Sequence, residues 1–463
     1  MERTIELPET GNAKDAILAE LAAKKAGDAD WKGAKTWSLV YYLDEEHDDF
    51  IKRAYELYFS ENALNPMAFK SLRRMEHEVV RMAASLLHGD AETVGVMSSG
   101  GTESCLLAVK TWRDWARAKK PFLRRPEIVL AESAHVAWFK GAEYFDVKPV
   151  VVPVDGDFRM DVAEARKRIG KNTVLVVASA PDYPHGLVDP IPELGRVAEE
   201  KGVPLHVDAC LGGFFLPFME ALGRPVPAWD FRVRGVKSIS ADVHKYAFAA
   251  KGASVILYRD MDYMEKQFFQ KDDWPGGVFI SPALLGTRPG GAIAAAWAAL
   301  MATGRAGYRE MARTTLDAAD RLRAGIAATP GLKLVGSPTG SIFSFGSAEK
   351  GLDIFAVGDQ MESRGWHVDR LQKPEALHAM VTPRHGQVAE AYLADLAASV
   401  AAVRADPRLA RQGDAAMYGM IARVPLRGLV RDGVRKLMRN LYGSECVMPG
   451  FDALGTGTTE ERP

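Results

Sequence analysis

Cysteine is scarce in this sequence, and long apolar runs are absent. The 463 residues include three cysteines, Cys105, Cys210 and Cys446, and none of them stands in a CxxC spacing. We therefore expect neither disulfides nor a zinc site, and a reducing cytoplasm suits such a chain. The apolar stretch 292–301 is too short to cross a bilayer, which takes about 18 residues or more. We therefore expect no transmembrane segment.

An excess of charge of either sign is also missing. The 59 basic and 60 acidic residues leave a net charge of -1, so nucleic acid is not an expected partner. The first ten residues include Glu2, Glu6 and Glu9, a composition unlike that of a signal peptide. With 47% hydrophobic residues, the chain is long enough for a large core and more than one domain.

Short β-rich runs alternate with helical stretches between residues 94 and 260. This spacing predicts an α/β fold with a largely parallel sheet and helices on both faces, and such sheets bind ligands at the carboxyl ends of their strands. The expected strands are 94–97, 128–131, 147–154, 173–179, 204–207, 238–241 and 254–258, and the expected helices between them are 103–119, 162–169 and 191–201.

Four segments follow from the pattern along the chain. We expect a mostly helical N-terminal segment at 1–70 and a large α/β domain at 71–300. A smaller α+β domain follows at 301–454, with a helix at 388–405. The Gly/Thr/Glu-rich tail at 455–463 has the composition of a disordered end.

The first segment with a chemical signature is Ser98-Ser99-Gly100-Gly101-Thr102-Glu103. It follows an apolar strand and opens a helix. Two glycines allow close approach of backbone N–H groups, and the helix N-terminus favours an anion, so the segment suits a phosphate. A plain strand-to-helix turn has the same pattern. No lysine follows the glycines, which excludes a Walker loop.

The second segment is His206-Val207-Asp208-Ala209, at the end of an apolar strand. Asp208 could bind a metal beside His206, or be a buried carboxylate that caps the backbone. A third role is to pair with a pyridinium nitrogen and keep that ring protonated. The metal reading is the weaker one, since no further ligand falls nearby in a metal-binding spacing.

The third segment is Ser240-Ala241-Asp242-Val243-His244-Lys245. Most lysines are solvated surface residues, but Lys245 follows a β-rich run among apolar neighbours. We expect burial to lower its pKa, because a neutral amine can form an imine with an aldehyde.

The order of these three segments is more specific than any one of them. A phosphate loop, an acid and a His-Lys pair each follow a strand, and pyridoxal 5'-phosphate (PLP) needs a phosphate site, a pyridine partner and an imine lysine. His135 follows another strand, where it could stack on the cofactor ring or be an ordinary polar strand end. The sequence thus predicts a PLP enzyme.

These residues stand within longer stretches that resemble the sphingosine-1-phosphate lyases, a group II decarboxylase family of fold-type I PLP enzymes. The resemblance runs from about Trp37 to about Leu441. The stretches that carry it are SSGGTES at 98–104, PHGLVDPIPE at 184–193, HVDACLGGF at 206–214, SISADVHKY at 238–246, QFFQKDDWPGGVFISPALLGTRPGGAIAAAWAALM at 267–301 and AAMYGM at 415–420.

The resemblance implies a fold-type I PLP-dependent transferase fold, with a seven-stranded, mostly parallel sheet. It also implies a homodimer with active sites shared between the subunits. The cofactor-binding positions that it implies are Gly100, Gly101, Thr102, His135, Asp208, His244, Lys245 and Thr287, the last reaching the partner's cofactor phosphate. The catalytic positions are Lys245, Tyr183 and His135, and the substrate-binding positions are Tyr41, Asn65 and Lys251.

The implied reaction cleaves the C2–C3 bond of a phosphorylated sphingoid base, giving a fatty aldehyde and phosphoethanolamine. Asn65 stands where the family has a phosphate-binding histidine, and an amide carries no charge to hold a dianion. The segment 247–250, before Lys251, also departs from the family pattern. An amino-acid decarboxylase, or a lyase for another β-hydroxy amine, therefore stays open as an alternative. So does a PLP-binding protein without turnover, against which the complete cofactor set argues.

Overall fold

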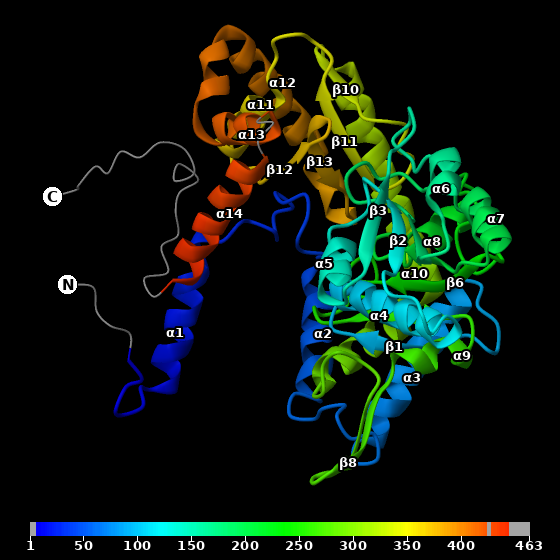
Figure 1. The fold of residues 1–463 in the computed structure, drawn as a ribbon. Coiled ribbons are helices and arrows are strands. Elements are labelled where there is room, and N and C mark those ends of the chain that lie inside the picture. Colours follow the sequence, from blue (N-terminus) through cyan, green and yellow to red (C-terminus); the bar gives the residue numbers. More distant parts are fainter. Residues whose placement is uncertain (1–5, 424–426, 444–463) are drawn as a thin grey trace.

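The computed structural model of the chain describes residues 6–423 and 427–443 (Figure 1). A seven-stranded sheet forms the centre of the larger part, and its strand order is β1-β7-β6-β5-β4-β2-β3. The strands are β1 (Val94–Ser98), β2 (Glu127–Ala131), β3 (Lys148–Val152), β4 (Thr173–Ser179), β5 (Leu205–Asp208), β6 (Val236–Ala241) and β7 (Ser254–Tyr258). Each expected strand is confirmed to within a few residues.

The sheet is largely parallel, as the alternating sequence pattern predicts. The pairs β2–β3, β2–β4, β4–β5 and β5–β6 are parallel. Strand β7 is the exception, because it runs antiparallel to both β6 and β1. The carboxyl ends of the parallel strands therefore lie along one edge, where their following loops meet.

Both faces of the sheet are covered, which explains why its strands read as continuous apolar runs. In β2, Ile128 and Leu130 pack into the core that includes α4 (Gly101–Lys119) and α5 (Ala137–Tyr144). The alternate residues Val129 and Ala131 pack into the core on the other face. A strand buried on both sides needs apolar residues at every position. The helices over the second face include α3 (Lys70–Leu86), α6 (Val162–Arg168), α7 (Ile191–Lys201), α8 (Leu216–Ala221) and α10 (Gly290–Ala328).

A smaller unit follows the long helix α10. Its antiparallel sheet has the order β10-β11-β13-β12 and packs against α11 and α12 around a separate core. Helix α10 bends at Gly304, whose φ of 57° is left-handed. The expected domain boundary between 300 and 301 falls inside this helix. The elements are β10 (Leu332–Leu334), β11 (Ile342–Ser347), α11 (Ile354–Glu362), β12 (Asp369–Gln372), β13 (Glu375–Met380), α12 (Ala389–Ala405) and α13 (Gly413–Arg423).

Three further features lie at the periphery of the chain. Helices α1 (Lys14–Lys24) and α14 (Arg427–Tyr442) extend away from the body, and the hairpin β8 (Phe269–Trp274)–β9 (Gly277–Ser281) projects from it (Figure 1). Helix α2 (Glu45–Glu56) packs against α10. In the ranges 6–423 and 427–443, none of the helices combines the length and apolar character that crossing a bilayer requires. Cys446 and the tail 455–463 lie outside the described residues.

Candidate active site

A cavity of about 470 Å³ opens at the carboxyl ends of the strands, between the two sheets. It brings together side chains that are far apart in the sequence. Ten of the positions expected from the sequence line it, namely Tyr41, Gly100, Gly101, Thr102, His135, Tyr183, Asp208, His244, Lys245 and Lys251. The three segments with a chemical signature thus meet in one place.

The glycine-rich turn forms one wall of this cavity. Helix α4 begins at Gly101, so its first N–H groups lack carbonyl partners within the helix and can bind an anion. A Cβ atom at Gly101 would lie 2.7 Å from Oδ2 of Asp242 and 2.9 Å from Sγ of Cys210. Only glycine allows the helix to start this close to the cavity floor. A Cβ at Gly100 would lie 3.6 Å from the His244 ring, so His244 borders the same turn.

Lys245 and His244 lie in the loop after β6, and both face Asp242. Nζ of Lys245 is 3.0 Å from Oδ2 of Asp242, and Nε2 of His244 is 3.7 Å from the same oxygen. Nδ1 of His244 accepts a hydrogen bond from the N–H of Ala253 at 3.3 Å, so a neutral ring carries its proton on Nε2. The other oxygen of Asp242, Oδ1, is buried and has no partner among the described groups.

The expected low pKa of Lys245 is wrong for the chain without cofactor. Burial lowers the pKa of this amine, but the charge and hydrogen bond of Asp242, together with Cys210 and Asp208, outweigh burial and leave the pKa above its usual value. Lys245 is therefore an ammonium that Asp242 holds in place. Burial alone would give the low pKa, and the acid three residues before the lysine, Asp242, is the main reason for the difference.

Asp208 ends β5 on the cavity floor and is 7% exposed. Its Oδ2 accepts a hydrogen bond from Nε1 of Trp138 at 2.8 Å, and Oδ1 accepts one from the N–H of Cys210 at 3.1 Å. Burial raises the pKa of Asp208, but His135, Trp138 and Cys210 together reverse the effect and leave it below the usual value. Asp208 is thus a buried carboxylate that stays ionised.

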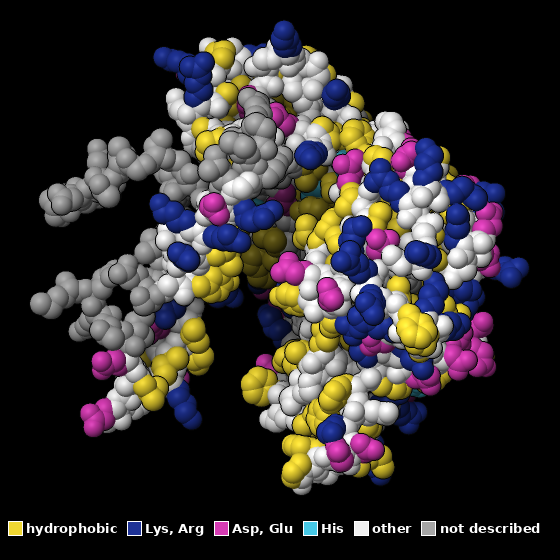
Figure 2. Space-filling view, in the orientation of Figure 1, with side chains coloured by type: hydrophobic (Ala, Val, Ile, Leu, Met, Phe, Trp, Pro, Cys, Tyr) yellow, Lys and Arg dark blue, Asp and Glu magenta, His cyan; other side chains and the backbone are white. Residues whose placement is uncertain are grey.

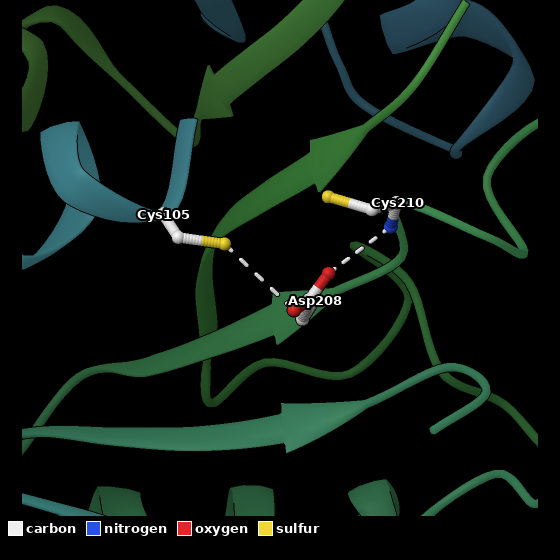
Figure 3. Close-up of side chains that lie close together, drawn as sticks. All are labelled: Cys105, Asp208 and Cys210. Carbon is white, nitrogen blue, oxygen red and sulfur yellow. Dashed lines mark hydrogen bonds between the residues drawn. The ribbon is translucent and has the colours of Figure 1, made fainter. Parts of the chain in front are cut away.

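Two thiols flank this carboxylate, and Cys105, Asp208 and Cys210 lie close enough together to be candidate metal ligands (Figure 3). Burial raises the pKa of Cys105 to about 11, and contact with Cys105 together with burial raises that of Cys210 well above its usual value. Metals bind thiolates, so two protonated thiols are poor ligands. His206, the other ligand considered from the sequence, lies 2.7 Å and 3.2 Å from the hydroxyls of Ser238 and Ser240.

Tyr41 and Lys251 lie together at another wall of the cavity. Nζ of Lys251 is 5.3 Å from the centre of the Tyr41 ring, and the Tyr41 hydroxyl donates to Sδ of Met380 at 2.9 Å. Part of the Lys251 side chain is exposed, yet desolvation of its amine and the charge of Lys245 lower its pKa to about 8. The cavity thus holds a second cation besides Lys245.

His135 and Tyr183 lie next to each other, with ring centres 6.3 Å apart and nearly perpendicular planes. Nδ1 of His135 accepts a hydrogen bond from the N–H of Ala137 at 3.2 Å, which leaves Nε2 to carry the proton of a neutral ring. Burial raises the pKa of Tyr183, and the carboxylate of Asp369 raises it further. Tyr183 therefore enters a reaction as a phenol.

Two expected positions, Asn65 and Thr287, do not line the cavity of their own chain. Both side chains are exposed, and Oδ1 of Asn65 accepts a hydrogen bond from the N–H of Met67 at 2.9 Å. Their loops lie side by side, joined by a hydrogen bond from the N–H of Ala63 to the carbonyl of Arg288 at 2.9 Å. Both assignments stay predictions, and that of Thr287 requires a second subunit.

Sequence reasoning missed four residues of the site. Asp242 could have been found, because it stands in the segment that contains Lys245. Trp138 follows His135 by three positions, about one helical turn, which was a weak signal. Asp369 and Met380 line the cavity from β12 and β13. Nothing in the sequence places these strands at the carboxyl edge of the large sheet.

The residues present fit PLP. The glycine turn and helix start suit its phosphate, the ionised Asp208 suits a protonated pyridine nitrogen, and Lys245 supplies the amine. The orphaned Oδ1 of Asp242 leaves a buried acceptor beside that amine. The residues therefore match the phosphate, the pyridine nitrogen and the aldehyde of the cofactor.

Comparisons with known proteins agree with this chemistry. Residues 63–345 match the family described as "Pyridoxal-dependent decarboxylase conserved domain". The sphingosine-1-phosphate lyase of Oryza sativa is 44% identical over 92% of this chain and 80% of its own length. The structure of the sphingosine-1-phosphate lyase of Burkholderia pseudomallei is 38% identical, with a TM-score of 0.86 over 95% of this chain and 97% of that one.

A glutamate decarboxylase of Lactobacillus brevis shares the fold at greater distance. It is 23% identical, with a TM-score of 0.73 over 86% of this chain and 95% of that one. This likeness supports the expected fold-type I architecture, with its large sheet and smaller C-terminal unit. The chain belongs to the pyridoxal-dependent decarboxylase family, within it to the sphingosine-1-phosphate lyases, and its cofactor is PLP.

Proposed function

We propose that the chain cleaves the C2–C3 bond of a phosphorylated sphingoid base to a fatty aldehyde and phosphoethanolamine. The observation that carries this proposal is a second cation, Lys251, in the cavity of Lys245 and Asp208. A lyase for this substrate needs one amine for the cofactor and another positive group for the substrate phosphate. The names of the most similar relatives point to the same substrate.

Each role in the reaction goes to a residue of the cavity. When bound, PLP supplies a protonated ring that draws electrons away from the breaking bond. Asp208 keeps the ring nitrogen protonated, and Lys251 with Tyr41 orients the phosphate end of the substrate. Lys245 can carry a proton once it is free of the cofactor, and Asp242 stabilises its ammonium form. Tyr183 and His135 are the other candidate proton carriers, and both line the cavity next to each other.

We also propose that the enzyme acts as a homodimer whose subunits complete each other's sites. Thr287 and Asn65 lie together on exposed loops, outside their own cavity. An apolar groove of about 850 Å³ adjoins them and includes Leu64, Phe268 and Ile280. Hydrophobic side chains also gather on α1 and α14 (Figure 2), among them Leu18, Leu21, Val434 and Met438. A second copy would cover these apolar surfaces.

Product analysis tests the proposed reaction. Incubation with sphinganine-1-phosphate and PLP should release aldehyde and phosphoethanolamine in equal amounts. Amino acids should yield no carbon dioxide, which separates the lyase from the alternative decarboxylase. An Asn65→His variant should bind the substrate more tightly, because a protonated imidazole can pair with the phosphate. Failure of both proteins to form aldehyde would refute the proposed substrate.

The pKa of Lys251 predicts a pH dependence for substrate capture. Above pH 8 the amine loses the charge that binds a phosphate dianion, so kcat/KM should fall about tenfold between pH 7 and pH 9. A Lys251→Arg variant is the matched control, since its guanidinium stays charged throughout this range. The fall should be absent in that variant. An equal fall in both proteins would remove Lys251 from phosphate binding.

A further inference from the structure

Behind Tyr183, away from Lys245, lies a buried histidine that the proposed reaction does not yet use. His378 on β13 is directly opposite Asp369 on β12 in the smaller sheet. Its ring stacks on the ring of Tyr183, with centres 4.4 Å apart and planes 27° apart. The side chain of Asp369 is 24% exposed, lines the active-site cavity and lies beside the Tyr183 hydroxyl. Tyr183 therefore separates the cavity from His378.

The hydrogen bonds fix where His378 carries its proton. Nε2 lies 2.8 Å from the main-chain carbonyl oxygen of Tyr183, and a carbonyl can only accept. Nε2 must therefore donate. Burial lowers the pKa of His378, even though the charge of Asp369 opposes this, so the ring is neutral. Nδ1 then has a free lone pair.

This lone pair faces another acceptor. Nδ1 of His378 is 3.9 Å from Oδ2 of Asp369, and neither atom has a hydrogen-bond partner within the described ranges. Two buried acceptors that face each other are unfavourable, because each lost its hydration on folding and gained no donor. One added proton between them would satisfy both. The pair is therefore a place where a proton can be held.

The other charged groups near the pair are already engaged. Asp182 accepts hydrogen bonds from Nδ1 of His185 at 2.8 Å and from the N–H of Leu187 at 2.9 Å. Arg370, next to Asp369 on β12, pairs with Asp359 and Glu362 at 2.6 Å and 2.8 Å. Asp369 itself lines the cavity, and Tyr183 lies between the cavity and His378.

We propose that His378 and Asp369 together hold the proton that leaves the C3 hydroxyl of the substrate, and that Tyr183 passes it to them. This inference rests on the proposed C2–C3 cleavage. The Tyr183 oxygen accepts the hydroxyl proton as the C3–O group becomes a carbonyl and the C2–C3 bond breaks. The phenol's own proton moves to the carboxylate of Asp369, which faces Nδ1 of His378 and shares the proton with it.

With this step, the protons released and taken up in the reaction balance. Cleavage removes one proton from the C3 oxygen, and the amine product requires one proton at C2. The held proton can return through Tyr183, so no net proton is taken from solvent. The high pKa of Tyr183 fits a transfer in which the phenol gives up one proton as it gains another, without a stable phenolate. Asp369 and Tyr183 are catalytic residues here, and His378 is a positioning residue.

Kinetics of single and double variants test the relay. Asp369→Asn should lower kcat about 100-fold, as expected for loss of a proton acceptor, and should change KM less than threefold. Tyr183→Phe should lower kcat by a similar factor. The double variant should have a kcat no lower than that of either single variant. Glu349→Gln, which removes an exposed carboxylate of the same unit, is the control and should keep full activity. The relay would be overturned if the kcat loss of the double variant equalled the product of the two single losses. A kcat of Asp369→Asn within threefold of the wild type would overturn it as well.

A measurement on the chain without cofactor separates the relay from the proposed substrate. The imidazole of His378, assigned by the signal that disappears in His378→Gln, can be titrated by NMR. Asp369→Asn should move its titration to lower pH by one unit or more, because the facing carboxylate no longer stabilises the proton. An unchanged titration would refute the shared proton even if the enzyme cleaves its substrate. If Asp369→Asn does not fold, His378→Gln should show the same 100-fold loss of kcat.

Discussion

A Lys245→Ala variant should fold, should lack the absorbance of lysine-bound PLP, and should lose at least about 1,000-fold in kcat. The reason is positional. Lys245 lies within the cavity that contains Asp208 and the glycine turn, and Asp242 fixes its amine with a 3.0 Å contact. An alanine offers no amine for the covalent link, and no other group of the cavity takes that position.

Lys251→Ala is the matched control for this variant, because it removes an amine from the same cavity. It should keep the absorbance of the lysine-bound cofactor and lose affinity for the phosphorylated substrate. Absorbance spectra of both variants with added PLP, followed by turnover assays, distinguish the two lysines. If the absorbance persisted in Lys245→Ala and disappeared in Lys251→Ala, the roles assigned to the two amines would be reversed.

The large sheet was predictable because its sequence repeats a simple pattern. Its strands are short apolar runs, the intervening helices are amphipathic or Ala-rich, and both patterns report burial directly. The meeting of the site residues followed from the same pattern. Since each chemical segment comes directly after a strand, and most strands are parallel, the segments had to gather at one edge.

The remainder of the site depends on contacts that no local pattern encodes. Asp369 reaches the cavity, and His378 lies behind Tyr183, only because the smaller sheet packs over the carboxyl edge of the larger one. Trp138 on α5 donates a hydrogen bond to Asp208 at the end of β5, a contact that requires the final fold. The protonation of Lys245 depends on Asp242, and the sequence does not show that this carboxylate faces the lysine amine. Asn65 and Thr287 lie outside the cavity of their own chain, and their proposed roles rest on the proposed homodimer.

An Asp208→Asn variant should lose about 1,000-fold or more in kcat while still binding PLP through Lys245. The amide has the same shape but no charge, so it cannot keep the pyridine nitrogen protonated. It also fits its surroundings poorly. Nε1 of Trp138 and the N–H of Cys210 are donors, so one of them would face the NH₂ group of the amide.

Trp138→Phe provides the graded comparison for this prediction. It leaves the carboxylate but removes one of its donors, so the pKa of Asp208 should rise and kcat should fall by a smaller factor, about tenfold. The loss should be larger at low pH, where a carboxylate with a raised pKa becomes protonated first. Measurements of kcat and of the cofactor absorbance from pH 5 to pH 8 in both variants check that Asp208→Asn loses more activity than Trp138→Phe. Full activity of Asp208→Asn would mean that the ring nitrogen obtains its charge from another group, and the electrostatic basis of the active site would have to be reassigned.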